Sequence, residues 1–433
     1  MFISDCLNVN KEGHLTIGGI STVSLAEKYG TPLYVMDENL IRDNIRSFKK
    51  SIERYYAGHG LVAYASKAFA CKAMYAICKD EGIGVDVVSG GELYTALQAG
   101  FDPENIVFHG NNKTPDELAM AVKAGVGRIV VDNISELHLL DGIARAAGKN
   151  VRIMFRIKPG VDAHTHNFIR TGQIDSKFGF ALETGEAMAA VEEALKLPEL
   201  TLVGLHCHIG SQIFDIEPFE HAAEVMLQFM GEIKNKYGAV LKELNLGGGF
   251  GIKYLPEHDP DDYDTYMKRV STVVKKTTAQ LGMPEPFILI EPGRSIVGPA
   301  GITLYKVGAI KEIPGIRTYV SIDGGMGDNP RYILYQSDYD VMVANKAAEQ
   351  KTEVVTVAGK CCESGDLIQE NASIQHVEVG DVLAVLATGA YNYSMASNYN
   401  RIPRAAVVFV KDGRDRLAIR RETYDDLVLC DCE

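Results

Sequence analysis

The sequence lacks the features of an exported, membrane-spanning or nucleic-acid-binding protein. None of the apolar runs in its 433 residues is long enough to cross a bilayer, and residues 1–5 lack the basic and apolar blocks of a signal peptide. Lysine and arginine number 44 against 57 aspartate and glutamate, so the net charge of −13 opposes non-specific attraction to nucleic acid or to an anionic membrane. We therefore expect a cytoplasmic protein.

Cysteine is scarce, and its spacing is uninformative. Eight cysteines in a chain of this length, without an export signal, indicate thiols rather than a disulfide framework. Neither Cys361-Cys362 nor Cys430-Asp431-Cys432 has the spacing of a zinc half-site, and the chain shows no internal repeat or low-complexity segment. A hydrophobic content of 46% in 433 residues exceeds what one ordinary core holds, which predicts two domains.

Apolar runs alternate with helical stretches from residue 61 to residue 290. The runs are Leu61–Ala65, Val85–Val88, Ile106–His109, Arg128–Val131, Val151–Ile157, Leu202–Ile209, Glu243–Leu246 and Phe287–Ile290. The helical stretches include Gly91–Ala99, Pro115–Ala124, Ile134–Ala147, Glu183–Lys196, Pro218–Lys236 and Tyr263–Leu281. Eight strands alternating with helices over about 250 residues predict a closed parallel (β/α)8 barrel of the TIM type, with a doubly wound open sheet as the alternative.

The pattern changes after Gly298. β-rich runs follow without long helices between them, at Ile302–Ile310, Thr318–Ile322, Glu353–Val357, Asp381–Leu386 and Ala405–Val410. A hairpin turn at Lys411-Asp412-Gly413 closes the series. We predict a barrel domain over residues 33–298 and a mostly antiparallel β domain formed by residues 299–433, with residues 1–32 packed against it.

Lys67 follows the first strand of the predicted barrel. The run Leu61–Ala65 has no polar side, as expected of a strand buried on both faces, and a lysine near its exit is a candidate for covalent chemistry through its amine. Such an amine can form a Schiff base with a carbonyl cofactor. A solvated lysine at a strand end is the alternative.

Residues at the other strand exits support a site, because chemistry in such barrels lies where the strands end. These residues are Asp86, Ser89, His109, Arg156, Lys158, His206–Ser211, Gly247–Gly249 and Glu291–Arg294. Glycines let a backbone approach an anion closely, so Gly249 and the amides of Gly293 and Arg294 form a candidate phosphate cradle. Glu291 could keep a ring nitrogen protonated, since a nearby opposite charge favours the charged form.

The two histidines after the sixth strand permit two interpretations. His206 and His208 are two residues apart, so they point to one face of the strand. They could form a metal pair with further ligands from Asp86, His109 or Glu291, as in barrel hydrolases. Alternatively, one of them could pack flat against an aromatic ligand.

The motifs together resemble a known family. Lys67, HCHIGSQ (206–212), GGGFG (247–251) and EPGR (291–294) resemble the alanine-racemase-like, fold type III class of pyridoxal-phosphate enzymes, and its decarboxylase branch in particular. In the second domain Asp323–Met326, Arg331–Tyr335, Cys362–Asp366 and Thr388–Tyr391 resemble the diaminopimelate decarboxylase family. That family converts meso-2,6-diaminopimelate to L-lysine and carbon dioxide, the last step of lysine biosynthesis.

The resemblance implies a role for each matched residue. Lys67 would be the Schiff-base lysine and Cys362 the proton donor, and the pyridoxal phosphate would be bound by Lys67, His208, Ser211, Gly249, Glu291, Pro292, Gly293, Arg294 and Tyr391. The substrate would be bound by Arg294, Arg331, Tyr335, Glu363 and Tyr391. The loop with Cys362 and Glu363 would cross to a partner's active site, which implies a homodimer with shared sites. No metal, nucleic acid or membrane is implied.

The chemistry of the substrate agrees with these residue types. Diaminopimelate carries a carboxylate and an amine at each end, and Arg294, Arg331 and Glu363 offer charges of both signs. Other readings stay open: a related basic amino-acid decarboxylase, a racemase, a metal-dependent barrel hydrolase and a non-catalytic relative. The sequence departs from the family pattern at Met326–Pro330 and at Lys360-Cys361.

Overall fold

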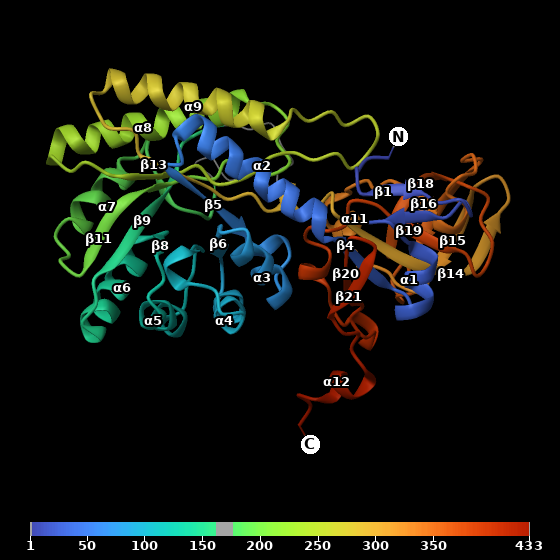
Figure 1. The fold of residues 1–433 in the computed structure, drawn as a ribbon. Helices are drawn as coiled ribbons and strands as arrows, with labels where there is room; N and C mark the ends of the chain where they lie inside the picture. The colour runs from blue at the N-terminus through green and yellow to red at the C-terminus, as the bar shows by residue number, and fades with distance from the viewer. Residues whose placement is uncertain (1, 162–175, 433) are drawn as a thin grey trace. The chain divides into compact units, whose positions relative to one another are not determined.

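The computed structural model of the chain describes residues 2–161 and 176–432 (Figure 1). Its contacts divide the chain into two compact units. The barrel unit comprises Asn44–Gly251 and Pro260–Gly293, and the β-rich unit comprises Met1–Asp43, Ile252–Asp259 and Arg294–Glu433.

Eight parallel strands form the barrel unit. They are β5 (Gly60–Ala65), β6 (Gly84–Val87), β7 (Ile106–Phe108), β8 (Arg128–Val131), β9 (Val151–Lys158), β11 (Leu200–His206), β12 (Glu243–Asn245) and β13 (Phe287–Ile290). Strand β8 pairs with β9 and β13 pairs with β5, so the sheet closes on itself, and the two-residue β10 (Phe180–Ala181) adds to the end of β9. The predicted TIM-type barrel is confirmed and the open sheet is not formed.

Helices surround these strands (Figure 1). They are α3 (Lys72–Asp80), α4 (Gly90–Gln98), α5 (Pro115–Ala124), α6 (Ile134–Ala147), α7 (Glu186–Ala194), α8 (Glu217–Tyr237) and α9 (Tyr263–Gln280). Several begin at side chains that cap the free backbone amides of the first turn. Thr114 and Glu117 form a capping box at α5, and Asn133 accepts the amide of Glu136 at α6.

Side chains fill the barrel interior in layers. Ala63, Val107, Val130, Met154 and Leu289 form a fully buried apolar layer. Below it, Arg128 and Glu243 form a buried ion pair, with 2.7 Å between Nε and Oε2. Side chains two residues apart on a strand point to the same side. The residues two positions after those of the apolar layer therefore form the next layer, toward the carboxyl ends of the strands.

The β-rich unit is built on a long sheet. Its strand order is β18 (Leu367–Ile374), β17 (Glu353–Ala358), β15 (Arg317–Ile322), β14 (Gly301–Ile313), β4 (Leu33–Asp37), β20 (Ala406–Lys411) and β21 (Arg414–Ile419). Strand β19 (Val382–Val385) pairs with β14 and with β16 (Val341–Val343). Only β15–β17 and β4–β20 pair in parallel among these, so the prediction of a mostly antiparallel domain is confirmed.

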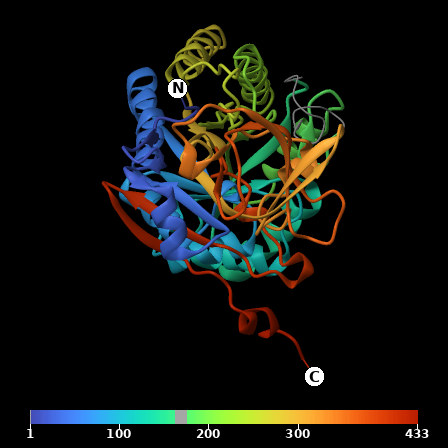
Figure 2. The ribbon, with the colours of Figure 1, turned by 90° about the vertical axis from the view of Figure 1, so that its right-hand side faces the viewer.

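The N-terminal residues contribute to the same unit. Figure 2 shows blue strands from this part of the chain beside red and orange strands from its C-terminal part. Strand β4 pairs with β14 on one side and with β20 on the other. A small sheet of β1 (Leu7–Val9), β2 (Leu15–Ile17) and β3 (Ile20–Ser21) precedes it, with α1 (Thr22–Tyr29). The domain boundary at residue 33 stays a prediction. In the structure, β4 pairs with strands of the β-rich unit.

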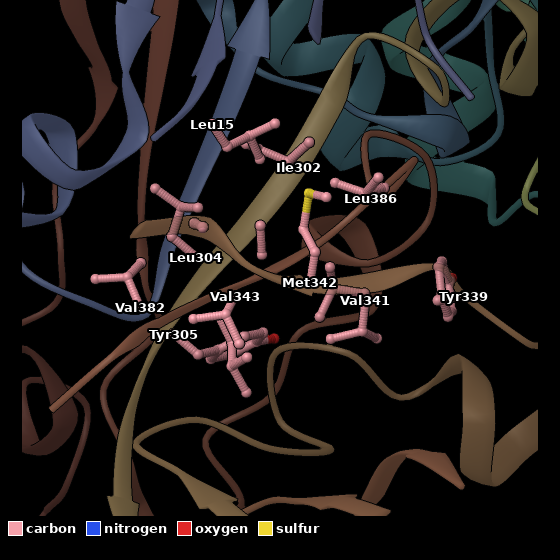
Figure 3. Packing of buried hydrophobic residues seen from close by; sticks show 14 of the residues in the cluster. Leu15, Ile302, Leu304, Tyr305, Tyr339, Val341, Met342, Val343, Val382 and Leu386 are labelled. Atoms are coloured by element: carbon pink, nitrogen blue, oxygen red, sulfur yellow. The ribbon is translucent and has the colours of Figure 1, made fainter. Parts of the chain in front are cut away.

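The core of the β-rich unit joins distant parts of the chain. Leu15 from β2 lies with Ile302 and Leu304 from β14, and with Met342 from β16 (Figure 3). The remaining helices are α2 (Glu38–Tyr56), α10 (Arg294–Val297), α11 (Arg331–Tyr335) and α12 (Tyr424–Val428). In the part of the chain that the structure describes, no helix has both the length and the apolar character needed to span a bilayer.

Candidate active site

A polar layer lies above the apolar layer of the barrel. Each of its members follows an interior residue by two positions: His109 follows Val107, Asp132 follows Val130, Arg156 follows Met154 and Glu291 follows Leu289. His206 and Asn245 hold the same position on β11 and β12. All six side chains are at most 6% exposed. Charged and polar groups are therefore concentrated at the carboxyl ends of the strands, where barrel active sites lie.

Glu291 is held by two neutral side chains. Its Oε1 accepts a hydrogen bond from Asn245 Nδ2 at 2.6 Å, and its Oε2 lies 2.9 Å from His206 Nε2. Burial lowers the pKa of His206 well below its ordinary value, with a smaller contribution from Arg156, so this imidazole stays neutral. Burial raises the pKa of Glu291. A buried carboxylate with uncharged hydrogen-bond partners suits a cationic group on a ligand.

Arg156, His109 and Asp86 extend this network. Arg156 Nη1 is hydrogen-bonded to His109 Nε2, and His109 Nδ1 lies 4.0 Å from Asp86 Oδ1. The ring of His109 lies 4.9 Å from the ring of His206, centroid to centroid. Burial raises the pKa of Asp86 well above its ordinary value, and the charge of Glu291 raises it further. The predicted exit residues of β6, β7, β9, β11 and β13 thus meet in one place.

Lys67 belongs to the same cluster. It lies on a short 3-10 helix, Ser66–Ala68, directly after β5, and its side chain is partly exposed between two buried neighbours. Its charge lowers the pKa of both Asp86 and Glu291, which partly offsets the effect of burial on these carboxyls. The amine is therefore close to the carboxylates of the polar layer.

The exit of β13 packs tightly against the exit of β5. Ala65 N donates to Pro292 O at 3.2 Å. A Cβ atom on Gly293 would lie 2.9 Å from Ala65 Cβ and 3.1 Å from Ala68 Cβ, so only glycine fits without displacing the segment that carries Lys67. The glycine therefore sets the distance between the loop of Lys67 and the loop of Glu291.

The glycine loop after β12 packs against the loop after β11. Gly249 has φ of 119°, and a Cβ atom there would lie 2.5 Å from Gly210 O. Ile213 N donates to Gly249 O at 2.9 Å, and Gly248 N donates to His208 Nδ1 at 3.3 Å. The second bond makes Nδ1 of His208 the acceptor, which orients its ring. The structure therefore brings together His208, Gly249 and the loop that begins with Ser211.

The β-rich unit holds a second group of predicted residues. The guanidinium carbon of Arg294 lies 4.8 Å from the centre of the Tyr391 ring, and that of Arg331 lies 5.6 Å from the same ring. Arg331 also lies 5.2 Å from the ring of Tyr335, and Arg294 Nη1 donates to the hydroxyl of Tyr254. Cation–π contacts of this kind hold two arginines side by side. Four of the predicted substrate residues therefore form one cluster.

Cys362 and Glu363 differ from this cluster in their exposure. Both lie on the loop between β17 and β18, and both are exposed, whereas Arg294 and Arg331 are buried. Cys362 N donates to Asn400 Oδ1 at 2.7 Å. The loop itself is anchored, because the carboxylate of Asp366 accepts the amides of Met326 at 2.5 Å and Cys361 at 2.7 Å. This carboxylate connects the two segments in which the sequence departs from the family pattern.

The residues of these clusters that were not predicted include Asp132 of the polar layer as well as Asn245, Tyr254 and Lys113. Asn245 was hidden inside a run interpreted only as a strand, and Tyr254 lies on a loop after the GGGFG motif without a motif of its own. Lys113 is also buried, with Nζ 2.8 Å from Glu136 Oε1. A polar residue inside an otherwise apolar strand, two positions before a glycine turn, was the available signal for Asn245.

The metal interpretation gains no geometric support. Within residues 2–161 and 176–432, the structure arranges no group of three or more His, Cys, Asp or Glu side chains as a metal site. Nε2 of His206, one of the proposed ligand atoms, is directed at Glu291 instead.

Comparison with known proteins gives matches over the whole chain. Residues 38–298 match the family model of the pyridoxal-binding domain of pyridoxal-dependent decarboxylases. The chain is 50% identical over 434 residues to the diaminopimelate decarboxylase of Bacillus subtilis (strain 168), covering 100% of this chain and 98% of the relative. It is 46% identical to that of Synechocystis sp., covering 98% and 91%. The crystal structure of the M. jannaschii diaminopimelate decarboxylase with L-lysine superposes with a TM-score of 0.92 at 38% identity, covering 100% of this chain and 99% of that one.

Proposed function

The chain belongs to the pyridoxal-dependent decarboxylase family, and on that premise we propose that it is a diaminopimelate decarboxylase. It converts meso-2,6-diaminopimelate to L-lysine and carbon dioxide with pyridoxal 5'-phosphate as cofactor, the last step of lysine biosynthesis. The observation that carries the proposal is the 50% identity to a diaminopimelate decarboxylase over 100% of this chain and 98% of the relative.

The residues of the barrel unit fit the cofactor. Glu291 is a buried carboxylate whose hydrogen bonds come from neutral groups, so it suits a protonated ring nitrogen. The loops at Gly249 and Gly293 leave no room for a Cβ atom and let backbone amides approach an anion. When bound, the cofactor supplies an electron sink for the pair of electrons left at the substrate α-carbon after loss of carbon dioxide.

Each barrel residue has a distinct task in this proposal. Lys67 would hold the cofactor through its amine. His208 would hold the cofactor ring, and Glu291 and Pro292 would hold its ring nitrogen. The phosphate is bound by Ser211, Gly249, Gly293 and Arg294. The close packing of the β13 exit on the β5 exit supports this arrangement, because it fixes Lys67 relative to Glu291.

Substrate recognition is assigned to the arginine and tyrosine cluster. A guanidinium group binds a carboxylate through two parallel hydrogen bonds, and Arg294 and Arg331 share the ring of Tyr391. Tyr335, Glu363 and Tyr391 complete the set, with Glu363 placed to accept from an ammonium group. Two arginines favour a substrate with a distal carboxylate over one with a lone distal amine.

Cys362 is proposed as the proton donor, with its thiol protonating the α-carbon after carbon dioxide leaves. Its exposure, and that of Glu363, support the further proposal of a homodimer in which this loop enters the partner's active site. We also propose that the protein is cytoplasmic and binds neither nucleic acid nor membrane, as its charge of −13 supports.

The test is an assay of carbon dioxide and lysine release from meso-diaminopimelate, with lysine, arginine and ornithine offered separately. We expect turnover of meso-diaminopimelate alone, dependent on added pyridoxal phosphate and insensitive to a metal chelator. Preferential release of carbon dioxide from lysine or ornithine would replace the proposed substrate by a basic amino acid. Inhibition by the chelator without dependence on pyridoxal phosphate would favour the metal hydrolase.

A further inference from the structure

His206 and Asn245 hold the two oxygens of Glu291 from neighbouring strands. His206 ends β11 and Asn245 ends β12, and neither side chain has any exposed surface. His206 Nε2 lies 2.9 Å from Oε2 and Asn245 Nδ2 lies 2.6 Å from Oε1. Asn245 is fixed in turn, because its Oδ1 accepts the amide of Gly247 at 2.9 Å. The carboxylate is therefore held in one orientation by two donors that carry no charge.

The tautomer of His206 follows from these contacts. Nδ1 is buried and makes no hydrogen bond with any residue that the structure describes. The ring is neutral, so it carries one proton, and Nε2 is the ring nitrogen that faces an acceptor, the Glu291 carboxylate. The proton therefore lies on Nε2, where it is donated to Glu291. A hydrogen bond to the charged form of a carboxyl stabilises that form.

Resting on the proposed function, we propose that His206 is a positioning residue that, together with Asn245, keeps Glu291 ionised and aimed at the ring nitrogen of pyridoxal phosphate. His206 does not contact the reacting atoms in this role. It acts through Glu291, whose negative charge keeps the nitrogen protonated and so maintains the electron sink. The role is distinct from that of His208, which packs on the ring itself.

The surrounding charges explain why this help is needed. The groups that face Glu291 are His206 on β11, Cys207 after it, Asn245 on β12, Lys67 after β5, Asp86 on β6 and Arg156 on β9. Lys67 and Arg156 favour the ionised form, whereas burial opposes it. Lys67 is partly exposed and engages the cofactor in the proposed reaction, so its charge is not constantly available. The two neutral donors act at all stages of the reaction.

Substitutions of similar length separate the hydrogen bond from packing. His206→Gln places an amide nitrogen near the position of Nε2 and keeps the donor. His206→Met has nearly the same length but no donor, and His206→Asn keeps an amide that is too short to reach Glu291. The measurements are the dissociation constant of pyridoxal phosphate from the apoenzyme, the nitrogen-15 chemical shift of the bound cofactor's ring nitrogen, and the pH profile of kcat.

We expect His206→Met and His206→Asn to weaken cofactor binding by about 10-fold to 100-fold, the factor that corresponds to one hydrogen bond to a charged group. The ring nitrogen should shift toward the value of an unprotonated pyridine. The acid limb of the kcat profile should move to higher pH, because the pKa of Glu291 rises when a donor to its charged form is lost. His206→Gln should restore all three readouts toward the wild type.

Each possible result supports or contradicts the role of His206 as a donor to Glu291. Equal impairment of the Gln and Met variants, or an unchanged nitrogen-15 shift in Met and Asn, would show that His206 only fills space. Should His206→Met fail to fold, the Asn and Gln pair gives the same comparison. A wild type that neither binds pyridoxal phosphate nor releases carbon dioxide would instead refute the proposed function on which the inference rests.

Discussion

In the proposed reaction Lys67 supplies the amine that binds the cofactor covalently, and Cys362 supplies the thiol that donates a proton. The surroundings of the two residues differ. Lys67 lies beside the buried carboxyls Asp86 and Glu291, whose pKa values its charge lowers. Cys362 lies on an exposed loop held by its backbone amide and by Asp366. Substitution at the two positions should therefore separate cofactor attachment from protonation.

Replacing Lys67 by alanine should remove both the covalent bond to the cofactor and turnover. The reason is that Lys67 is the lysine directly after β5, beside the carboxyls of Asp86 and Glu291. We expect loss of the visible absorption band and no carbon dioxide release above background. Treatment with borohydride should no longer fix the cofactor on the protein. Lys72→Ala, an exposed lysine five residues later, serves as the control and should leave all three unchanged. A Lys67→Ala enzyme with measurable turnover would exclude this amine from the reaction.

Replacing Cys362 by alanine should lower kcat and leave the cofactor band intact. Loss of a positioned general acid typically costs about 10²-fold to 10⁴-fold in rate, while the barrel residues that bind the cofactor are unaffected. Spectra and steady-state kinetics with meso-diaminopimelate measure the two effects. Cys430→Ala is the matched control, because that thiol is also exposed. Unimpaired turnover in the Cys362 variant would assign protonation to another group.

At the scale of elements, two loops set the position of the proposed phosphate site. The loop after β12 approaches the loop after β11 so closely that a Cβ atom on Gly249 would lie 2.5 Å from Gly210 O. The backbone of Gly249 also has φ of 119°, a conformation that other residues rarely adopt. Both constraints concern the backbone and are independent of any charged side chain.

Gly249→Ala should therefore weaken cofactor binding without a change in charge. Strain of this kind costs about 1–3 kcal/mol, which corresponds to a loss of affinity of about 5-fold to 150-fold when the loop moves to relieve it. Titration of the apoenzyme with pyridoxal phosphate measures the loss. Gly142→Ala is the control, since this exposed glycine of α6 has no atom within 4 Å of an added Cβ and should gain about 0.4–1 kcal/mol of stability. Equal affinities in the two variants would contradict the assignment of the loop.

The sequence predicted the elements that have a local period and missed those that depend on distant partners. All eight barrel strands and six of the helices between them were predicted, because each carries an apolar run or a capped amphipathic stretch, whereas α3 was not named. Strand β18 was missed because Gln369, Glu370 and Asn371 interrupt its apolar pattern. Asn371 has φ of 52°, and the pairing of β17 with β18 contains register shifts there and nearby. The pairing of β4 with β14 and β20 joins residues hundreds of positions apart, which no local pattern reveals.

In the candidate site too, residues with a local sequence signal were predicted and residues that depend on distant partners were missed. Lys67, Glu291 and the glycines were predicted because strand exits and glycine turns are visible in the sequence. Asn245 and Tyr254 were missed because their importance comes from the residue across the barrel or across a loop, Glu291 and Arg294 respectively.

At the scale of the whole molecule, one buried carboxyl makes the stability of the β-rich unit depend on pH. Asp328 is 4% exposed and accepts the amide of Gly325 at 3.1 Å, and burial raises its pKa to about 7. Between about pH 4 and pH 7 the folded chain therefore holds a proton that the unfolded chain has released. The contribution of Asp328 to the free energy of unfolding therefore falls as pH rises through that range, by at most about 1.4 kcal/mol per pH unit.

Asp328→Asn should remove this dependence, because asparagine keeps an acceptor oxygen and does not ionise. The difference in urea midpoint between the variant and the wild type should grow in favour of the variant as pH rises from 5 to 8. Asp5→Asn, an exposed aspartate, is the control and should show no such trend. A difference that is constant with pH would mean that Asp328 is ionised in the fold at all these values.

Two inactive variants should restore each other's activity if the proposed homodimer shares its sites. Lys67→Ala lacks the amine in the barrel and Cys362→Ala lacks the thiol on the exposed loop, so a mixed dimer contains one site with both groups only when the two come from different chains. Mixing equal amounts after reversible dissociation should recover up to about a quarter of wild-type turnover, because half of the dimers are mixed and each has one intact site. Sedimentation measures the dimer, and Lys67→Ala mixed with itself is the control. Recovery of no activity from mixtures that sediment as dimers would place both groups of each site on the same chain.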